Sequence, residues 1–68
     1  MLDINRLRGA IYTKHTNVTE FATSLGWTRQ RVSMILRGKQ RVDVDDARLM
    51  ADKLGLTDAE TIQIFLSR

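Results

Sequence analysis

The chain has 68 residues, of which 43% are hydrophobic, and it carries 11 Lys and Arg against eight Asp and Glu. This length predicts one small domain, near the lower size at which a hydrophobic core alone stabilises a fold. With no cysteine and one histidine, the sequence excludes a disulfide framework, a thiolate zinc site and a thiol nucleophile. It also lacks a glycine-rich phosphate loop. We therefore expect a single domain over residues 1–68 with no cofactor, no metal and no enzymatic activity.

The hydropathy pattern indicates whether the protein is expected in a membrane or in solution. No apolar run approaches the roughly 20 residues that a membrane span requires, and no charged and then apolar leader opens the chain. The lack of cysteine suits a reducing compartment. These features predict a soluble, cytoplasmic protein with no membrane partner.

Charge is unevenly distributed along the chain. Residues 1–41 contain eight Lys and Arg and two acidic residues, a net +6, whereas residues 42–68 contain three and six, a net −3. Such asymmetry indicates a surface that binds a polyanion, either nucleic acid or an acidic protein. An ordinary solvated surface can have the same charge composition, so the placement of the charges must decide between a binding surface and a solvated one.

The absence of proline and the repeated capping residues predict an all-α domain of five short helices. The first is expected over Ile4–Lys14, capped by Asp3 and with Leu7 and Ile11 at helical spacing. The second is expected to begin at Asn17, whose side chain can cap forward while Glu20 reaches back to the amide of the cap.

Two amphipathic segments joined by a short link follow within residues 17–39. The apolar residues that share one face of each segment are Phe21, Ala22 and Leu25 in the first and Val32, Ile35 and Leu36 in the second. Gly26 provides the backbone freedom to end the first segment, and Thr28 offers a hydroxyl to cap the next. So short a link forces a steep crossing, which predicts a helix-turn-helix over about residues 18–37.

The fourth helix is expected to begin at Asp43 and end at Gly55. Its inward residues are expected to be Val44, Ala47, Met50, Ala51 and Leu54.

The fifth helix is expected to begin with a capping box at Thr57 and Glu60. Its inward residues are expected to be Ile62, Phe65 and Leu66. Ile64 and Leu49 then become candidates for an exposed apolar patch that pairs two copies, although isolated exposed aliphatic residues are common.

The third helix begins with an unusual first turn. Arg29 and Arg31 place cations beside the positive end of the helix dipole, where acidic residues are preferred. Together with Thr28 and Gln30 they form a set that an anionic partner would stabilise. Arg and Gln also match guanine and adenine edges in the major groove, so this turn predicts base reading.

The rest of the third helix extends this surface. Ser33, Met34 and Arg37 lie on the face away from Val32 and Ile35. Gly38 is expected to end the helix, and Lys39, Gln40 and Arg41 follow in an exposed turn suited to phosphate.

These residues resemble the Cro and lambda-repressor type of helix-turn-helix proteins, found in temperate-phage switch proteins and many bacterial regulators. The resemblance covers roughly Ile4–Leu56, and its most specific positions are Phe21-Ala22, Leu25-Gly26, Val32, Ile35, Arg37-Gly38-Lys39 and Leu54-Gly55-Leu56. It implies a lambda-repressor-like five-helix fold that binds double-stranded operator DNA, usually as a homodimer on two half-sites. The residues it places at the interface are Asn17 on phosphate, Thr28, Arg29, Gln30, Arg31 and Met34 in the major groove, and Lys39 to Arg41 on the backbone.

Three positions depart from the family pattern. Val18 and Met34 stand where polar contacting residues are common, and Trp27 stands in the turn where a smaller aliphatic is usual. An aromatic, a methionine and arginines together also describe a protein-binding surface. The chain is similar to the modulator-of-repression antirepressors of temperate phages, which implies an alternative function. It would bind the DNA-binding domain of a cognate repressor and thereby block the operator binding of that repressor.

Overall fold

The computed structural model describes residues 1–66, and within them the chain forms helices and short connections only. The five helices are α1 (Ile4–Lys14), α2 (Val18–Leu25), α3 (Arg29–Leu36), α4 (Val44–Leu54) and α5 (Asp58–Phe65). The all-α expectation is confirmed, and the helix bounds agree with those expected from the sequence. In this part of the chain, no helix combines the length and the apolar character needed to cross a membrane.

Every helix begins at a side chain that satisfies a free backbone amide of its first turn. The caps are Asp3, Asn17, Thr28, Asp43 and Thr57, and each accepts a hydrogen bond from the amide three residues later. The helix starts expected from the sequence are therefore confirmed.

The two expected capping boxes differ in outcome. At α5 the box is complete, and the amide of Thr57, which donates to the Glu60 carboxylate at 2.9 Å, is the main reason that the pKa of Glu60 lies below its ordinary value. At α2 the expected box is wrong. Glu20 accepts instead from the amide of Thr16, one residue before the cap, and pairs with His15.

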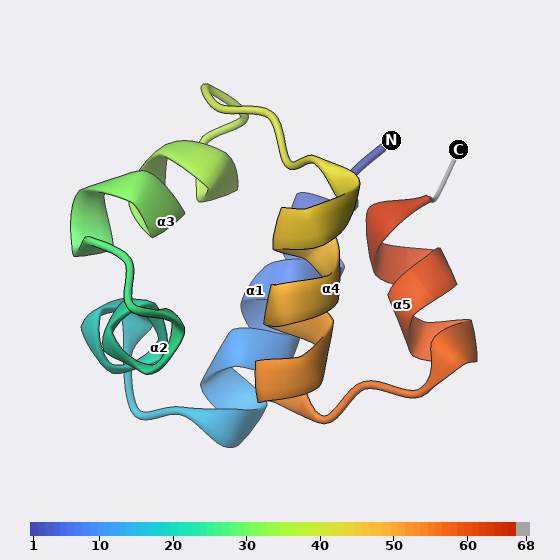
Figure 1. Ribbon diagram of the computed structural model, residues 1–68, viewed down its shortest axis with the longest axis horizontal. Coiled ribbons are helices and arrows are strands. Elements are labelled where there is room, and N and C mark those ends of the chain that lie inside the picture. The colour runs from blue at the N-terminus through green and yellow to red at the C-terminus, as the bar shows by residue number, and fades with distance from the viewer. Residues whose placement is uncertain (67–68) are drawn as a thin grey trace.

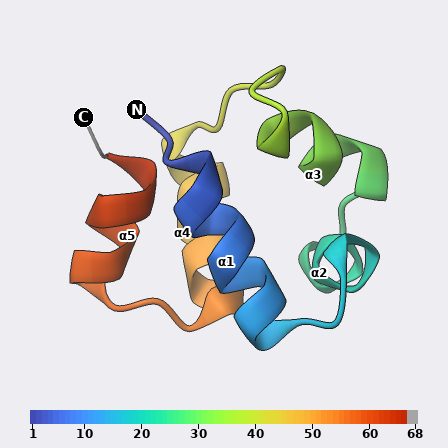
Figure 2. The same cartoon turned by 180° about the vertical axis from the view of Figure 1, so that it is seen from behind.

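The helices are arranged so that α3 and α5 lie at opposite sides of the molecule (Figure 1). The view from behind shows the same separation, with α1 and α4 between them (Figure 2). The two ends of the described chain lie near each other, on the side of α5 and away from α3. One face of α3 is consequently left clear of the rest of the fold.

The core is built from the apolar stripes of all five helices. Its most deeply buried large side chains are Phe21, Leu7, Ile11, Ile35, Met50, Leu54 and Val32. Ala22, also buried, is the small residue among them and sits on α2, which packs against both α3 and α4. A larger side chain has no room at such a crossing.

The inward face of α5 differs from the expected one. Ile64 and Phe65 are buried, whereas Ile62 is 56% exposed and Leu66 is 66% exposed. Phe65 belongs to both possible stripes, so helical spacing alone does not fix the rotation of α5. The rotation is set by packing against α1 and α4, and the amide of Asp3, the cap of α1, donates to the Ile64 carbonyl. Ile64 is therefore not part of an exposed patch, and only Leu49 of that expected pair is exposed.

The inward face of α4 is nearly as expected. Met50, Ala51 and Leu54 are buried and Ala47 packs partly against the core. Val44 is the exception, at 70% exposed, because it occupies the first turn of α4 on the rim of a groove.

The packing around Ala22 yields a stability test. Replacing it in Ala22→Leu should destabilise the fold by about 1–3 kcal/mol, because an overfilled core forces side chains and backbone to shift. Ala59→Leu, at an exposed helical position, should change stability by no more than about 0.5 kcal/mol. Urea unfolding followed by circular dichroism measures both, and equal stability of the two variants would contradict the crowded crossing.

Candidate nucleic-acid interface

The link between α2 and α3 is a tight turn. Gly26 has a φ of 75°, in the left-handed region that favours glycine. Its amide donates to the Thr23 carbonyl at 3.0 Å, and the Trp27 amide donates to the Ala22 carbonyl at 2.9 Å. These two bonds close a Schellman motif, and the Thr28 hydroxyl then accepts from the Arg31 amide at 3.2 Å. The predicted helix-turn-helix is thus present, and backbone groups at the end of α2 and at the start of α3 are hydrogen-bonded.

The two faces of α3 have opposite roles. Val32, Ile35 and Leu36 are buried and hold the helix on α1 and α2. Arg29 and Gln30 are exposed, at the end where α3 begins. Because the buried stripe fixes the rotation of the helix, the polar face must point to solvent.

The end of α3 carries the basic loop. Gly38 has a φ of 72°, its amide donates to the Ile35 carbonyl, and the Lys39 amide donates to the Met34 carbonyl at 2.9 Å. This second Schellman motif turns the chain outward, so that Lys39 and Arg41 are exposed. Figure 1 shows the loop as the arch that leads from α3 to α4.

A cation from another helix joins this end of α3. The Arg8 guanidinium on α1 donates to the Leu36 carbonyl at 3.4 Å, near the negative end of the α3 dipole. Sequence reasoning missed this residue, because nothing in the spacing of α1 shows that it meets a helix 28 positions away.

The structure leaves every predicted site residue at least partly accessible. Those exposed are Asn17, Thr28, Arg29, Gln30, Arg37, Lys39 and Arg41, and those half-buried are Trp27, Arg31, Ser33, Met34 and Gln40. Asn17 lies at the start of α2, where its side chain caps the helix by accepting from the Glu20 amide at 2.8 Å. Its contact with phosphate stays a prediction.

Arg31 differs from the expectation of two free guanidinium groups in the first turn of α3. Its Nη2 atom lies 2.9 Å from Oδ2 of Asp46, a residue of the first turn of α4. The same guanidinium lies over the Trp27 ring, 3.8 Å from the ring centroid. The indole is half-buried against the core and covered on one face. Only Arg29 of the two arginines is therefore free.

Asp46 is the residue that sequence reasoning missed here. The signal that could have found it is a pair of opposite charges in the first turns of two neighbouring helices.

Acidic residues lie on two sides of the molecule. Asp58 and Glu60 are exposed on α5, which lies across the molecule from α3 in Figures 1 and 2, whereas Asp43, Asp45 and Asp46 lie at the start of α4, where Asp46 contacts Arg31. The charge asymmetry of the sequence is therefore only partly an asymmetry in space.

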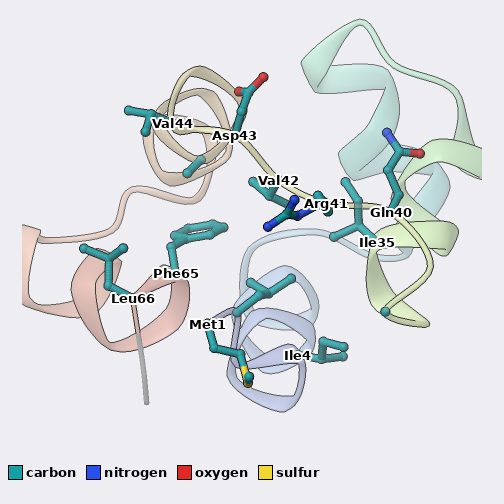
Figure 3. A pocket seen from close by; sticks show the side chains of 13 residues that line it. Met1, Ile4, Ile35, Gln40, Arg41, Val42, Asp43, Val44, Phe65 and Leu66 are labelled. Atoms are coloured by element: carbon teal, nitrogen blue, oxygen red, sulfur yellow. The ribbon is translucent and has the colours of Figure 1, made fainter.

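A groove of about 590 Å³ lies next to the basic loop. It is bordered by the starts of α1 and α4 and by the end of α5 (Figure 3). Phe65 points into it from α5, and Val42 of the loop lies across from the ring. Gln40 and Arg41 of the basic loop and Ile35 of α3 also line it.

The chain was compared with known protein families. The model of the family described as helix-turn-helix (HTH_3) matches residues 13–61, well over half of the chain. This chain belongs to the helix-turn-helix family. Members of this family are DNA-binding regulators and generally not enzymes, so the match indicates a DNA-binding transcription regulator. Neither the curated proteins nor the solved structures gave a match.

The turn that carries the basic loop can be tested through its glycine. Gly38→Ala should destabilise this helix-turn-helix protein by about 1–2 kcal/mol, because φ is positive there. The added methyl would lie an ordinary 3.6 Å from Ile4, so backbone strain rather than a clash is responsible. Gly9→Ala, inside α1 with no atom nearby, should instead stabilise it by about 0.5–1 kcal/mol. Thermal unfolding measures the change in stability of both variants, which should have opposite signs. A Gly38→Ala variant more stable than the unchanged protein would contradict the left-handed conformation at Gly38.

Proposed function

We propose that this helix-turn-helix protein binds operator DNA through α3 and regulates transcription in a phage-type lysis–lysogeny switch. The observation that supports this most is the exposed Arg29 at the start of α3, which pairs with no acidic side chain of the described residues. Arg29 lies in a first turn that contains no acidic residue. A cation there opposes the helix dipole and is stabilised when a polyanion docks against it.

Base reading is assigned to the residues of this end. Arg29 and Gln30 are exposed and adjacent, and the major groove is wide enough to admit a helix. The Arg fork matches O6 and N7 of guanine, and the Gln amide matches N6 and N7 of adenine. Met34, half-buried on the same helix, offers only apolar contact, for which a thymine methyl is the partner.

Phosphate binding is assigned to the residues that flank α3. Arg37, Lys39 and Arg41 follow the helix as exposed cations, and Asn17 begins the preceding helix. Contacts of this kind set the register of a protein on the duplex without carrying sequence information. The resemblance to temperate-phage switch proteins supports placing the regulator in such a switch.

Arg29 provides the direct test of DNA reading. Arg29→Ala should relax preference at one base pair of a selected duplex by about 1–3 kcal/mol, because the bidentate contact to guanine is lost. Affinity of the unchanged protein should also fall steeply with salt, with a slope of about −0.9 for each phosphate contact. Selection from a randomised duplex pool followed by fluorescence anisotropy measures both quantities.

The matched control for this variant is Arg6→Ala. Arg6 is an exposed arginine of α1 whose guanidinium donates to Gln63 of α5, on the far side from α3. It should leave base preference unchanged. If the unchanged protein binds no duplex even at low salt, the DNA-binding proposal is wrong.

A second function of the same surface is supported by its composition. Trp27 and Met34 are both partly exposed beside Arg29, and such a combination is typical of protein-binding hot spots. The protein would then be an antirepressor that occupies the DNA-binding domain of a cognate repressor. Arg31 covers one face of the Trp27 ring, so less of the indole surface is available to a partner than in a fully exposed tryptophan.

The antirepressor function predicts a different measurement. Added protein should release a cognate repressor from its operator, and Trp27→Phe and Trp27→Ala should weaken the association in that order. The loss for Trp27→Ala should reach at least about 2 kcal/mol if the indole is an anchor. Calorimetry with the repressor domain measures this loss, and unchanged affinity of Trp27→Ala would remove the indole from the interface.

A further inference from the structure

An ion pair connects the first turns of α3 and α4, whose backbones are not in contact. No Cα atom of α3 lies within 8 Å of one in α4, two helices that fall entirely within the described residues. The Arg31 side chain crosses this space to reach Asp46. Because the two backbones do not touch, this ion pair ties the exposed start of α3 to the start of α4.

Two contacts hold the guanidinium in place. Nη2 donates to Asp46 at 2.9 Å, and the group lies over the Trp27 ring. Nε is buried without a hydrogen-bond partner among the described residues, which is a cost of this position. Asp46 is itself placed by the Asp43 cap, which accepts from its amide at 2.8 Å. The side chains of Arg31 and Asp46 are only 34% and 20% exposed, so water screens the pair less than it screens a surface pair.

Moving Arg31 to a base edge would undo both contacts. It would uncover the indole of Trp27 and leave the Asp46 carboxylate without its cation, close to where phosphate would dock. An unpaired carboxylate there opposes a polyanion. Arg29 faces no such cost, because within residues 1–66 no ion pair or side-chain hydrogen bond involves it.

We propose that Arg31 is a positioning residue and that base choice belongs to Arg29 and Gln30 alone. This inference rests on the DNA-binding function proposed above and deepens it. Asp46 competes with DNA for the Arg31 guanidinium, and it thereby keeps a second cation out of the reading turn. Trp27 provides the platform on which the competing pair is held.

One consequence is that Asp46 limits non-specific binding. A free guanidinium in the first turn would bind any phosphate within reach, whatever the sequence. Because Asp46 holds the Arg31 guanidinium, affinity for all duplexes is lowered alike. A larger share of the binding free energy then comes from the sequence-dependent contacts of Arg29 and Gln30.

The experiment compares two carboxylates of the same helical turn. Asp46→Asn removes the partner of Arg31, and Asp45→Asn removes an exposed carboxylate that pairs with no cation in the described chain. Both lose one negative charge, so the difference between them reports the release of Arg31. The probes are the duplex selected by the unchanged protein and a scrambled duplex of equal length.

Asp46→Asn should bind the scrambled duplex several-fold more tightly than Asp45→Asn does. Its salt slope should also be steeper by about 0.9, the value for one further phosphate contact. Equal slopes for the two variants would overturn the proposal.

Variants of the arginines test base choice directly. Arg31→Lys keeps the charge opposite Asp46 but loses the planar fork that a bidentate base contact needs. It should keep the base preference of the unchanged protein, whereas Arg29→Lys should relax preference about tenfold or more at one base pair. Relaxed preference in Arg31→Lys equal to that in Arg29→Lys would overturn the proposal. Thermal unfolding of each variant shows that the fold is retained.

A readout without DNA separates this inference from the proposed function. Trp27 is the only tryptophan of the chain, so its fluorescence reports the group stacked on it. Asp46→Asn should shift this emission and Asp45→Asn should not. If the unchanged protein binds no duplex, the proposed function fails, while the emission still decides whether Asp46 holds Arg31 on the ring. Identical emission of the two variants would overturn the positioning role.

Discussion

The buried stripe of α3 is the constraint on which the rest of the molecule depends. Val32, Ile35 and Leu36 are held by α1 and α2, and the turn at Gly26 fixes the angle at which α3 leaves α2. Once that stripe is buried, helical geometry decides which residues point outward. The accessible chemistry of Arg29 and Gln30 is therefore a consequence of apolar packing on the other side of the same helix.

Local signals in the sequence were sufficient to predict the helices. The caps at Asp3, Thr28 and Asp43 and the left-handed turns at Gly26 and Gly38 depend on interactions within three to five residues, so spacing alone reveals them. The family match supports the same architecture for residues 13–61.

Two failures of prediction depend on contacts distant in the sequence, whereas the wrong capping box of α2 is local, because Glu20 accepts from the amide of Thr16 instead. The rotation of α5 follows from packing against α1 and α4, and the apolar spacing of Ile62, Phe65 and Leu66 could not determine it. The state of Arg31 depends on Asp46, 15 positions away. For the candidate site this means that the identity of the surface was predictable, whereas the number of free cations on it was not.

The separation of charge has a consequence for how the protein meets a polyanion. The exposed cations of α3 and of the loop after it lie across the molecule from Asp58 and Glu60 of α5, so these charges make a dipole component that points from α5 towards α3. The field of a nucleic acid exerts a torque on such a dipole before any contact forms. The protein is therefore oriented before it contacts the nucleic acid, and a larger fraction of diffusional encounters begins with α3 facing the nucleic acid.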